Sequence, residues 1–349
     1  MEEKRDRRTK SVTIYDVAAE AGVAASTVSR ALSRPGRVSA ETVEKVRAAA
    51  RKLGYRERTT PNWESRNSSK LLLVSVAGLG NLYFHHTLEG IHDEATKAGY
   101  SIIVADGRAR IEYERSTLES TIELADAAIM ISPRAPDAAL HQIAKQRPIV
   151  VVNRIVKDLH SVVQNVPDGM KQVTSHLHEL GHREITYVSG PSDTWLQIPR
   201  WESLHQSAHE RGMTAHRIGP FEASVKGGVT AADAWMTNRT TSVVTYNDDM
   251  ALGFMRALLE RGVRIPADVS VVGVDNSPIA PLYIPSLTSV ALAGYGQGKV
   301  AARAVLDTLA GDPPPTPVSV VPMKLMTRGS TGHANTVPPT VRSAAAASE

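Results

Sequence analysis

The fold of the first part of the chain is decided by residues 13–55, which read TIYDVAAEAGVAASTVSRALSRPGRVSAETVEKVRAAARKLGY. Apolar residues recur at helical spacing in three parts of this stretch, which predicts three short helices. Gly22 permits a sharp reversal after the first helix, because glycine readily adopts the left-handed backbone conformation found at helix ends. Ser39 can cap the third helix. The predicted helices begin after Thr13, at Ala25 and at Glu41, and the last two end at Leu32 and Leu53. Two helices joined by a glycine-containing turn are typical of the helix-turn-helix motif, whose second helix enters the major groove of DNA.

Positive charge is concentrated around this stretch. Residues 1–58 contain 14 Lys and Arg and 8 Asp and Glu, which gives this stretch a net charge of +6. Because the whole chain has a net charge of +4, residues 59–349 carry a net charge of −2. A basic N-terminal module on a mildly acidic body suits a nucleic-acid partner.

Composition also restricts chemistry and location. The chain contains no Cys, which excludes disulfides, thiolate metal ligands and Cys nucleophiles. The opening MEEKRDRRTK leads into no apolar segment of the kind found in signal peptides. The most apolar run, residues 71–79, is far shorter than the about 20 residues that cross a membrane. We therefore expect a cytoplasmic protein, associated with the nucleoid when bound to DNA, and no membrane partner.

Beyond residue 70 the sequence changes to short apolar runs that alternate with amphipathic segments. Runs that are apolar throughout predict strands buried on both faces, and their alternation with helices predicts parallel sheets. The predicted strands are residues 71–77, 101–105, 128–131, 149–152, 184–189, 242–246 and 269–274. The predicted helices are residues 86–98, 112–124, 170–180, 200–211, 250–261 and 297–309. Two such series predict two doubly wound α/β lobes, which bind ligands beyond the carboxyl ends of their strands.

Residues 13–55 resemble the DNA-binding domain of the lactose/galactose repressor family, whose members read T-x-x-D-V-A-x-x-A-G-V-S-x-x-T-V-S-R and then V-S-x-x-T-x-x-x-V. The matching residues are Thr13, Asp16, Val17, Ala18, Ala21, Gly22, Val23, Thr27, Val28, Ser29, Arg30, Val38, Ser39, Thr42 and Val46. Further motifs similar to the family follow in order at residues 180–183, 247–253, 271–275, 285–288 and 328–331. The resemblance implies an all-α helix-turn-helix head on an α/β two-lobed body like the type I periplasmic sugar-binding proteins, working as a dimer.

This resemblance and the composition predict the domain limits. Residues 1–58 form the helix-turn-helix domain, ordered from about residue 12, and the polar residues 59–70 form a hinge linker. The N-terminal lobe of the effector-binding core takes residues 71–162 and 292–322, and the C-terminal lobe takes residues 163–291 and 323–331. Residues 332–349 are small and aperiodic and are expected to be a disordered tail.

The resemblance also implies which residues meet DNA. Hydroxyls bond phosphate oxygens and fix register, whereas an Arg fork can pair with guanine O6 and N7. Ala25, Ser26 and Arg30 would face base edges, Thr13, Tyr15, Thr27 and Ser29 would face phosphates, and Arg37 is a further groove or phosphate contact. Thr27 and Ser29 can equally be plain helix surface, and Tyr15 can be a packing residue. Ala24 stands where the family has Ser, so the second helix lacks a side-chain cap, a loss of about 1 kcal/mol.

The hinge linker departs from the family pattern. In the family it folds into a short helix whose Leu wedges into the minor groove, but Glu64 occupies that position here and Pro61 lies three residues before it. A carboxylate is repelled by phosphates, and a proline inside a helix costs about 3 kcal/mol. Two alternatives stay open: Pro61 begins a helix that presents Trp63 as the wedge, or the linker is simply flexible.

The cleft between the lobes is the predicted effector site. Sugars and nucleosides need planar bidentate groups and an aromatic face. Family matches imply a site formed by Asn81, Phe84, Arg134, Arg200, Phe221, Asn247 and Asp275. Asn247 and Asp275 can instead cap the segments that follow them, and Phe84 can be a core residue. Leu292 and Gly294 replace a polar and an aromatic residue of sugar-responding relatives, which indicates a different specificity or a missing wall.

Other chemistry finds little support in the sequence. His176 and His178 lie on different faces of one predicted helix, and His182 belongs to a family turn motif, so no metal site is predicted. The chain has neither a complete phosphate-binding glycine loop nor an evident catalytic motif. We therefore predict no catalytic residue and no cofactor.

The sequence thus predicts a ligand-responsive transcriptional regulator, a repressor and not an enzyme. Its partners would be double-stranded operator DNA of near-palindromic sequence and a small-molecule effector, a carbohydrate or a nucleoside. The assembly would be a homodimer or a tetramer. The alternatives are a repressor that needs no effector, a small-molecule binding protein without a DNA role, and a nucleotide-using enzyme with the same kind of sheet. The basic head argues against the second, and the incomplete glycine loops argue against the third.

Overall fold

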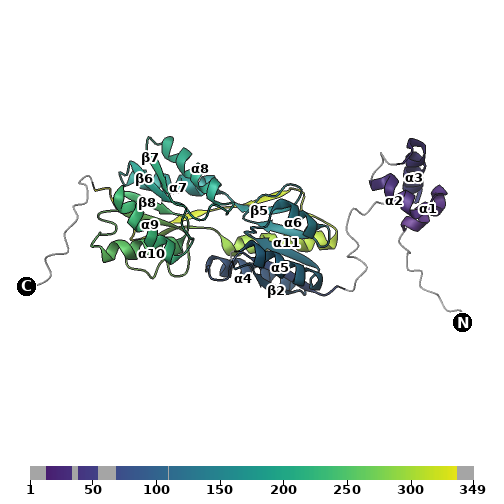
Figure 1. Cartoon of the computed structure of the whole chain (residues 1–349), viewed down its shortest axis with the longest axis horizontal. Coiled ribbons are helices and arrows are strands. Elements are labelled where there is room, and N and C mark those ends of the chain that lie inside the picture. The colour runs from purple at the N-terminus through teal and green to yellow at the C-terminus, as the bar shows by residue number, and fades with distance from the viewer. Residues whose placement is uncertain (1–12, 34–37, 54–67, 109, 336–349) are drawn as a thin grey trace, which may run out of the picture. The chain divides into compact units, whose positions relative to one another are not determined.

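The structure is a computed structural model that describes residues 13–33, 38–53, 68–108 and 110–335. The chain divides into two compact units, residues 1–62 and residues 63–349, here called the head and the body. Figure 1 shows the helices of the head and the two lobes of the body, each lobe built around a sheet.

The described part of the head consists of α1 (Ile14–Ala21), α2 (Ala25–Ser33) and α3 (Ala40–Leu53). Thr13 caps α1 in a reciprocal pair of bonds, because its hydroxyl accepts from the Asp16 amide while the Asp16 carboxylate accepts from the Thr13 amide at 2.7 Å. Gly22 ends α1 with a φ of +67°, as expected for a left-handed cap. Ser39 Oγ accepts from the Thr42 amide at 3.3 Å at the start of α3. These predicted helix ends are confirmed.

A small apolar core holds the three helices together. Val17 of α1, Val28 of α2 and Val46 of α3 are fully buried in it. A salt bridge at the surface joins Lys52 Nζ of α3 to Glu20 Oε1 of α1 at 2.7 Å. Because the core takes one side of each helix, α2 presents its other side to solvent.

The N-terminal lobe of the body contains a six-stranded parallel sheet in the order β11-β5-β4-β3-β1-β2. Its strands are β1 (Leu71–Val76), β2 (Ser101–Asp106), β3 (Ala127–Ile131), β4 (Ile149–Val152), β5 (His160–Gln164) and β11 (Val318–Val321). Its helices are α4 (Tyr83–Lys97), α5 (Ile111–Thr121), the 3-10 helix η3 (Ile122–Leu124), α6 (Asp137–Ala144) and α11 (Gly294–Ala310). Leu72 and Val74 share a core cluster with α4 and α11, whereas Leu73 packs with α5 and α6. Helices cover both faces of this sheet, which is why its inner strands β3 and β4 are apolar throughout.

The C-terminal lobe repeats this plan with the strand order β12-β10-β9-β8-β6-β7, in which only the pair β10 and β12 is antiparallel. Its strands are β6 (Glu184–Val188), β7 (Thr214–Ile218), β8 (Ser242–Thr245), β9 (Ser270–Asp275), β10 (Thr288–Ala291) and β12 (Lys324–Met326). Its helices are α7 (Val166–Glu179), α8 (Gln197–His209), α9 (Val225–Thr237) and α10 (Asp248–Glu260). The chain passes between the lobes after β5, β10 and β11, so each lobe is assembled from separate segments of the sequence.

Each strand and helix predicted beyond residue 70 corresponds to an observed element, but β5, β7, β10, β11, β12, α6 and α9 were not predicted. The first turn of α9 contains Gly227 and Gly228, a composition that usually weakens a helix. A Cβ at Gly228 would lie 2.1 Å from the Met250 carbonyl oxygen, so glycine here permits α9 and α10 to approach closely. Strand β7 lies at a sheet edge and has no fully buried residue, so its apolar pattern is weak.

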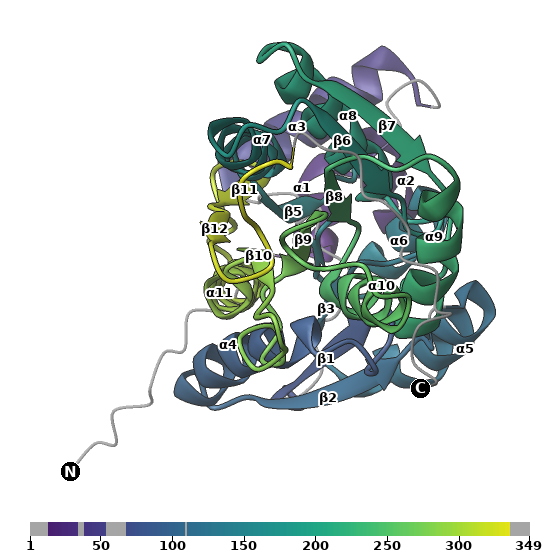
Figure 2. The same cartoon turned by 90° about the vertical axis from the view of Figure 1, so that its left-hand side faces the viewer.

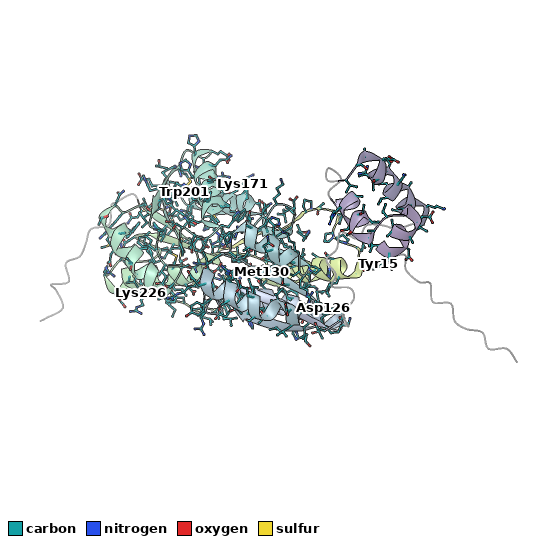
Figure 3. All side chains as sticks on the ribbon, turned by 45° about the vertical axis from the view of Figure 1, so that its right-hand side comes forward. Tyr15, Asp126, Met130, Lys171, Trp201 and Lys226 are labelled. Atoms are coloured by element: carbon teal, nitrogen blue, oxygen red, sulfur yellow. The ribbon has the colours of Figure 1, made fainter. Side chains whose placement is uncertain are left out.

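Two segments expected to be linker or tail belong in part to the folded body. The Asp126 carboxylate, marked in Figure 3, accepts hydrogen bonds from the Ser69 amide at 2.9 Å and the Lys70 amide at 3.2 Å. At the other end, the Ala334 amide donates to the Leu180 carbonyl at 2.8 Å. These hydrogen bonds fix the last residues of the predicted linker, and they show that residues 332–335 are not part of a disordered tail.

Candidate DNA interface and ligand cavity

The outer face of α2 carries the polar residues predicted to meet DNA. Ser26, Ser29 and Arg30 are exposed, and their spacing of three and four residues places them on one face of the helix. Ala25 and Thr27 beside them are half-buried. This face therefore offers hydroxyl groups and a guanidinium, which are the groups that bond phosphates and base edges.

The residues that flank this face have definite surroundings. Tyr15 of α1, marked in Figure 3, is 73% exposed, so the alternative of a packing role is wrong. The Thr13 hydroxyl donates to Asp16 Oδ2 at 2.7 Å, so Thr13 could donate to a phosphate only by giving up that bond. The Ala24 carbonyl accepts from the Thr27 amide at 2.8 Å, and its methyl group offers no cap to α2. The remaining predicted DNA and hinge residues, Arg37, Pro61, Trp63 and Glu64, lie outside the described residues.

A cavity of about 460 Å³ lies in the body where the carboxyl ends of the parallel strands of both sheets meet. In the N-terminal lobe, its walls are formed by α4 and by residues at or just after the ends of β1, β2, β3 and β4. In the C-terminal lobe, they are formed by α8 and by residues at or just after the ends of β6, β8 and β9. This is the position where doubly wound sheets bind ligands. The predicted effector residues that line it are Asn81, Phe84, Arg134, Arg200, Asn247 and Asp275.

Phe221 does not line this cavity, so the structure gives no support to its predicted contact. Its half-buried ring packs against the main hydrophobic core, and its amide donates to the Ser189 carbonyl at 3.0 Å. Ala223 and Ser224, which follow Phe221 toward the start of α9, line the cavity in its place.

Buried nitrogen donors are the outstanding feature of the cavity lining. Arg200 is 2% exposed, its Nη1 donates to the Tyr246 carbonyl at 2.6 Å, and its guanidinium lies 4.7 Å from the centre of the Tyr246 ring. Asn247 Oδ1 caps α10 by accepting from the Met250 amide at 3.0 Å, so the capping alternative holds for that atom. Arg200 Nε, Asn247 Nδ2 and Arg134 Nε have no acceptor among the described protein atoms. A ligand with oxygen acceptors would satisfy such donors.

Three carboxyl groups also line the cavity, those of Asp106, Asp249 and Asp275. Burial raises the pKa of Asp275 well above its usual range, and the positive charge of Arg200 partly opposes that rise. Burial likewise raises the pKa of Asp249. Hydrogen bonds donated by ligand hydroxyls would stabilise the charged form of such carboxyls.

Polar contacts connect the two lobes across the cavity. Arg134 Nη1, after β3, lies 2.6 Å from Asp193 Oδ2, after β6. Asn81 Nδ2, before α4, donates to Asp275 Oδ2 at 3.4 Å. The relative position of the lobes therefore affects side chains that also face the cavity.

Several lining residues are not among the predicted effector residues, namely Tyr83, Asp106, Arg108, Asn153, Arg154, Trp195, Tyr246 and Asp249. Asn153 and Arg154 directly follow a predicted strand, so examining every predicted strand end would have found them. Tyr83 belongs to a buried polar network in which Gln164 Nε2 donates to the Tyr83 hydroxyl at 2.9 Å and to Asn153 Oδ1 at 2.7 Å. Burial raises the pKa of Tyr83 to about 12, so its hydroxyl stays protonated at neutral pH.

The histidines considered for a metal have other partners. His182 is 1% exposed and hydrogen-bonds through Nδ1 to Thr241 Oγ1 at 2.8 Å and through Nε2 to Ser270 Oγ at 3.0 Å. His176 Nε2 lies 2.9 Å from Thr331 Oγ1. Both residues therefore connect segments of the C-terminal lobe.

Comparison with known proteins assigns both parts of the chain. Residues 13–57 match the family model of bacterial regulatory proteins of the lacI family, and residues 174–331 match that of a periplasmic binding protein-like domain. The HTH-type transcriptional regulator AscG of Escherichia coli is 32% identical over 295 residues, which cover 80% of this chain and 86% of AscG. The chain belongs to the lacI family of bacterial regulatory proteins. The predicted resemblance and fold class are thereby confirmed, and this lacI-family chain is a DNA-binding transcriptional regulator.

Solved structures agree with this assignment. The transcriptional regulator CelR in complex with cellobiose has a TM-score of 0.68 and 26% identity, covering 92% of this chain and all of that one. The lac repressor dimer bound to operator and an anti-inducer has the same TM-score and identity, with 93% of this chain covered and all of that one. Within the part of the lacI-family chain that the structure describes, no helix is long and apolar enough to cross a membrane.

Proposed function

We propose that this lacI-family regulator binds a near-palindromic operator as a homodimeric repressor, and that a sugar or nucleoside in the body cavity sets its affinity for DNA. The proposal of a ligand rests on three buried donors around one cavity, Arg134 Nε, Arg200 Nε and Asn247 Nδ2, which have no acceptor in the part of the chain that the structure describes. Buried polar groups are nearly always satisfied, so this lining fits a ligand rich in oxygen atoms. The cellobiose complex of CelR supports the same class of ligand.

The chemistry of the lining narrows the ligand further. Trp195 and Tyr246 add aromatic surface, which suits the apolar face of a sugar or base ring. Asp275 and Asp249 can accept hydrogen bonds from vicinal hydroxyls while Arg200 donates to ring or carbonyl oxygens. Donors, acceptors and an aromatic face together favour a polyhydroxylated ligand over a purely apolar one.

Cross-lobe contacts provide the link from ligand to DNA. A ligand that draws the lobes together or apart changes the pairs Arg134–Asp193 and Asn81–Asp275. The end of the linker is fixed to the N-terminal lobe through Asp126, so a lobe rotation would be transmitted to the segment that precedes the body. Allosteric coupling of this kind typically amounts to about 1–3 kcal/mol.

An exposed apolar segment of the C-terminal lobe supports assembly into a dimer. Leu282 and Ile284 are 78% and 85% exposed, and Ile279 nearby is 42% exposed. Neighbouring apolar side chains of this kind mark protein interfaces. A dimer would present two copies of α2 to major grooves about 34–36 Å apart. Replacing Leu282 and Ile284 by serine should shift the sedimentation coefficient toward that of a monomer, and an unchanged dimer would reject this interface.

The decisive experiment is a thermal-shift screen of sugars, polyols and nucleosides with the full-length protein, followed by operator binding with and without the hits. An operator can be obtained by selection from random duplexes. We expect a compound that raises the melting temperature and changes operator affinity, and we expect Arg200→Lys to lose that response while retaining DNA binding. If no compound has any effect but specific DNA binding remains, the protein acts as a repressor without an effector. If DNA binding does not weaken steeply as salt rises, the phosphate-contact model is wrong.

A further inference from the structure

Helix α4 carries a compact group of three metal-ligating side chains, His85, His86 and Glu89. Residues three and four apart in a helix lie on the same face, so the Glu89 carboxylate reaches both imidazole rings. His86 Nδ1 lies 2.8 Å from Glu89 Oε2, and His85 Nε2 lies 3.5 Å from Glu89 Oε1. One ligand atom from each residue lies within 4.8 Å of the other two. The three side chains are between 48% and 63% exposed, so an ion can approach from solvent.

We propose that His85, His86 and Glu89 bind a divalent transition-metal ion, with Zn²⁺ as the preferred ion. Zinc takes histidine nitrogen and carboxylate oxygen at about 2.0–2.2 Å, which places ligand atoms of a tetrahedral site roughly 3.4 Å apart. The two ring-to-carboxylate distances lie on either side of that value, so small side-chain rotations bring the atoms into place. Two imidazoles and one carboxylate form a three-ligand set that leaves a fourth position open.

The surroundings of His86 leave room for that fourth position. His86 lines a second cavity of about 230 Å³, together with Tyr295 and the backbone around Gly294. Tyr83, Asp275 and Leu292 line both this cavity and the larger one. An ion held by His86 would therefore lie at the edge of a space next to the ligand cavity, where water or a small anion can complete its coordination.

The simpler explanation is a pair of surface contacts between histidine and glutamate. Exposed contacts of this kind contribute little to stability. A neutral imidazole is the form that binds metal. The sequence-based expectation of no metal site considered only His176, His178 and His182. His85 and His86 are neighbours in the chain, and the Glu89 carboxylate lies close to a ring nitrogen of each.

The test is isothermal titration calorimetry of Zn²⁺ into the full-length protein without an affinity tag, in the absence of DNA and effector. We expect saturable binding of one ion per chain. His86→Ala and Glu89→Gln should each weaken it by at least about tenfold, since even changes outside the direct ligands cost that much in metal sites. His92→Ala is the matched control, because His92 lies on the same helix, is 61% exposed and also has a carboxylate nearby, but is outside the group. The affinity of the His92→Ala variant for Zn²⁺ should equal that of the unchanged protein.

Cobalt spectroscopy provides a second readout. Co²⁺ bound by two imidazoles and a carboxylate should give visible absorption that the unchanged protein and His92→Ala share and that His86→Ala loses. Circular dichroism checks that each variant is folded. Absence of saturable binding overturns the proposal, and so does equal affinity of the unchanged protein and a correctly folded His86→Ala. Neither result bears on the proposed function, because both are obtained without DNA and without an effector.

Discussion

Replacing Gly90 by alanine should destabilise the body, although alanine is the better helix former. Helices α4 and α11 lie side by side (Figure 2), and a Cβ at Gly90 would stand 2.1 Å from the Tyr295 carbonyl oxygen and 3.1 Å from the Lys299 amide nitrogen. Both are backbone atoms, so the helices must separate by about 1 Å to recover an ordinary contact. Overpacking costs about 1–3 kcal/mol, and the contact with backbone places this case at the upper end. Alanine returns about 1 kcal/mol in helix propensity, which leaves a net loss of about 2 kcal/mol.

Urea unfolding followed by circular dichroism measures this loss. With a slope of about 3 kcal/mol per molar urea, a loss of about 2 kcal/mol lowers the midpoint by about 0.7 M. Gly296→Ala is the control, because Gly296 lies in α11 and a Cβ there meets no atom within 4 Å. That variant should be about 0.5–1 kcal/mol more stable than the unchanged protein. A Gly90→Ala midpoint at or above that of the unchanged protein would refute the packing argument.

Three further predictions concern an ion pair, DNA recognition and a helix cap. Hydrogen bonds from Arg303 and Lys97 lower the pKa of Glu94 from 4.5 to about 2, so its stabilising contribution is complete above pH 4.5 and is lost as the pH falls toward 2. Glu94→Gln should therefore be less stable at neutral pH and show a flatter acid limb in unfolding by circular dichroism; an unchanged acid limb would contradict this. Arg30→Ala should weaken operator binding by about 5–150-fold, equivalent to about 1–3 kcal/mol of base readout, and random DNA binding by less. Fluorescence anisotropy with operator and with random duplexes measures both affinities. An equal loss of affinity for the two duplexes would exclude base readout by Arg30. Thr13→Ala should lower the stability of the head by about 1 kcal/mol, which calorimetry would record as a melting temperature about 4–8 °C lower for that unit, with the body unchanged.

Local patterns were sufficient for the helix-turn-helix head and for the inner strands other than β5 and β10. Capping by Thr13 and Ser39 and the reversal at Gly22 depend on residues no more than a few positions apart, so they can be read directly from the sequence. Strands covered by helices on both sides, such as β1 and β4, are apolar at nearly every position and are equally plain. Edge strands such as β7 carry a weaker pattern, because much of their surface faces solvent.

Long-range packing decided the composition of the cavity. Arg200 and Asp275 lie 75 positions apart along the chain and line one cavity only because the C-terminal lobe places α8 near the carboxyl end of β9. Phe221 matched the family pattern, yet the loop before α9 turns its ring into the core. The sequence by itself determined the family, the head and the strand-end residues from which a site could be assembled. Tertiary structure decided which of those residues face the cavity, because the direction of a side chain depends on contacts that sequence spacing does not contain.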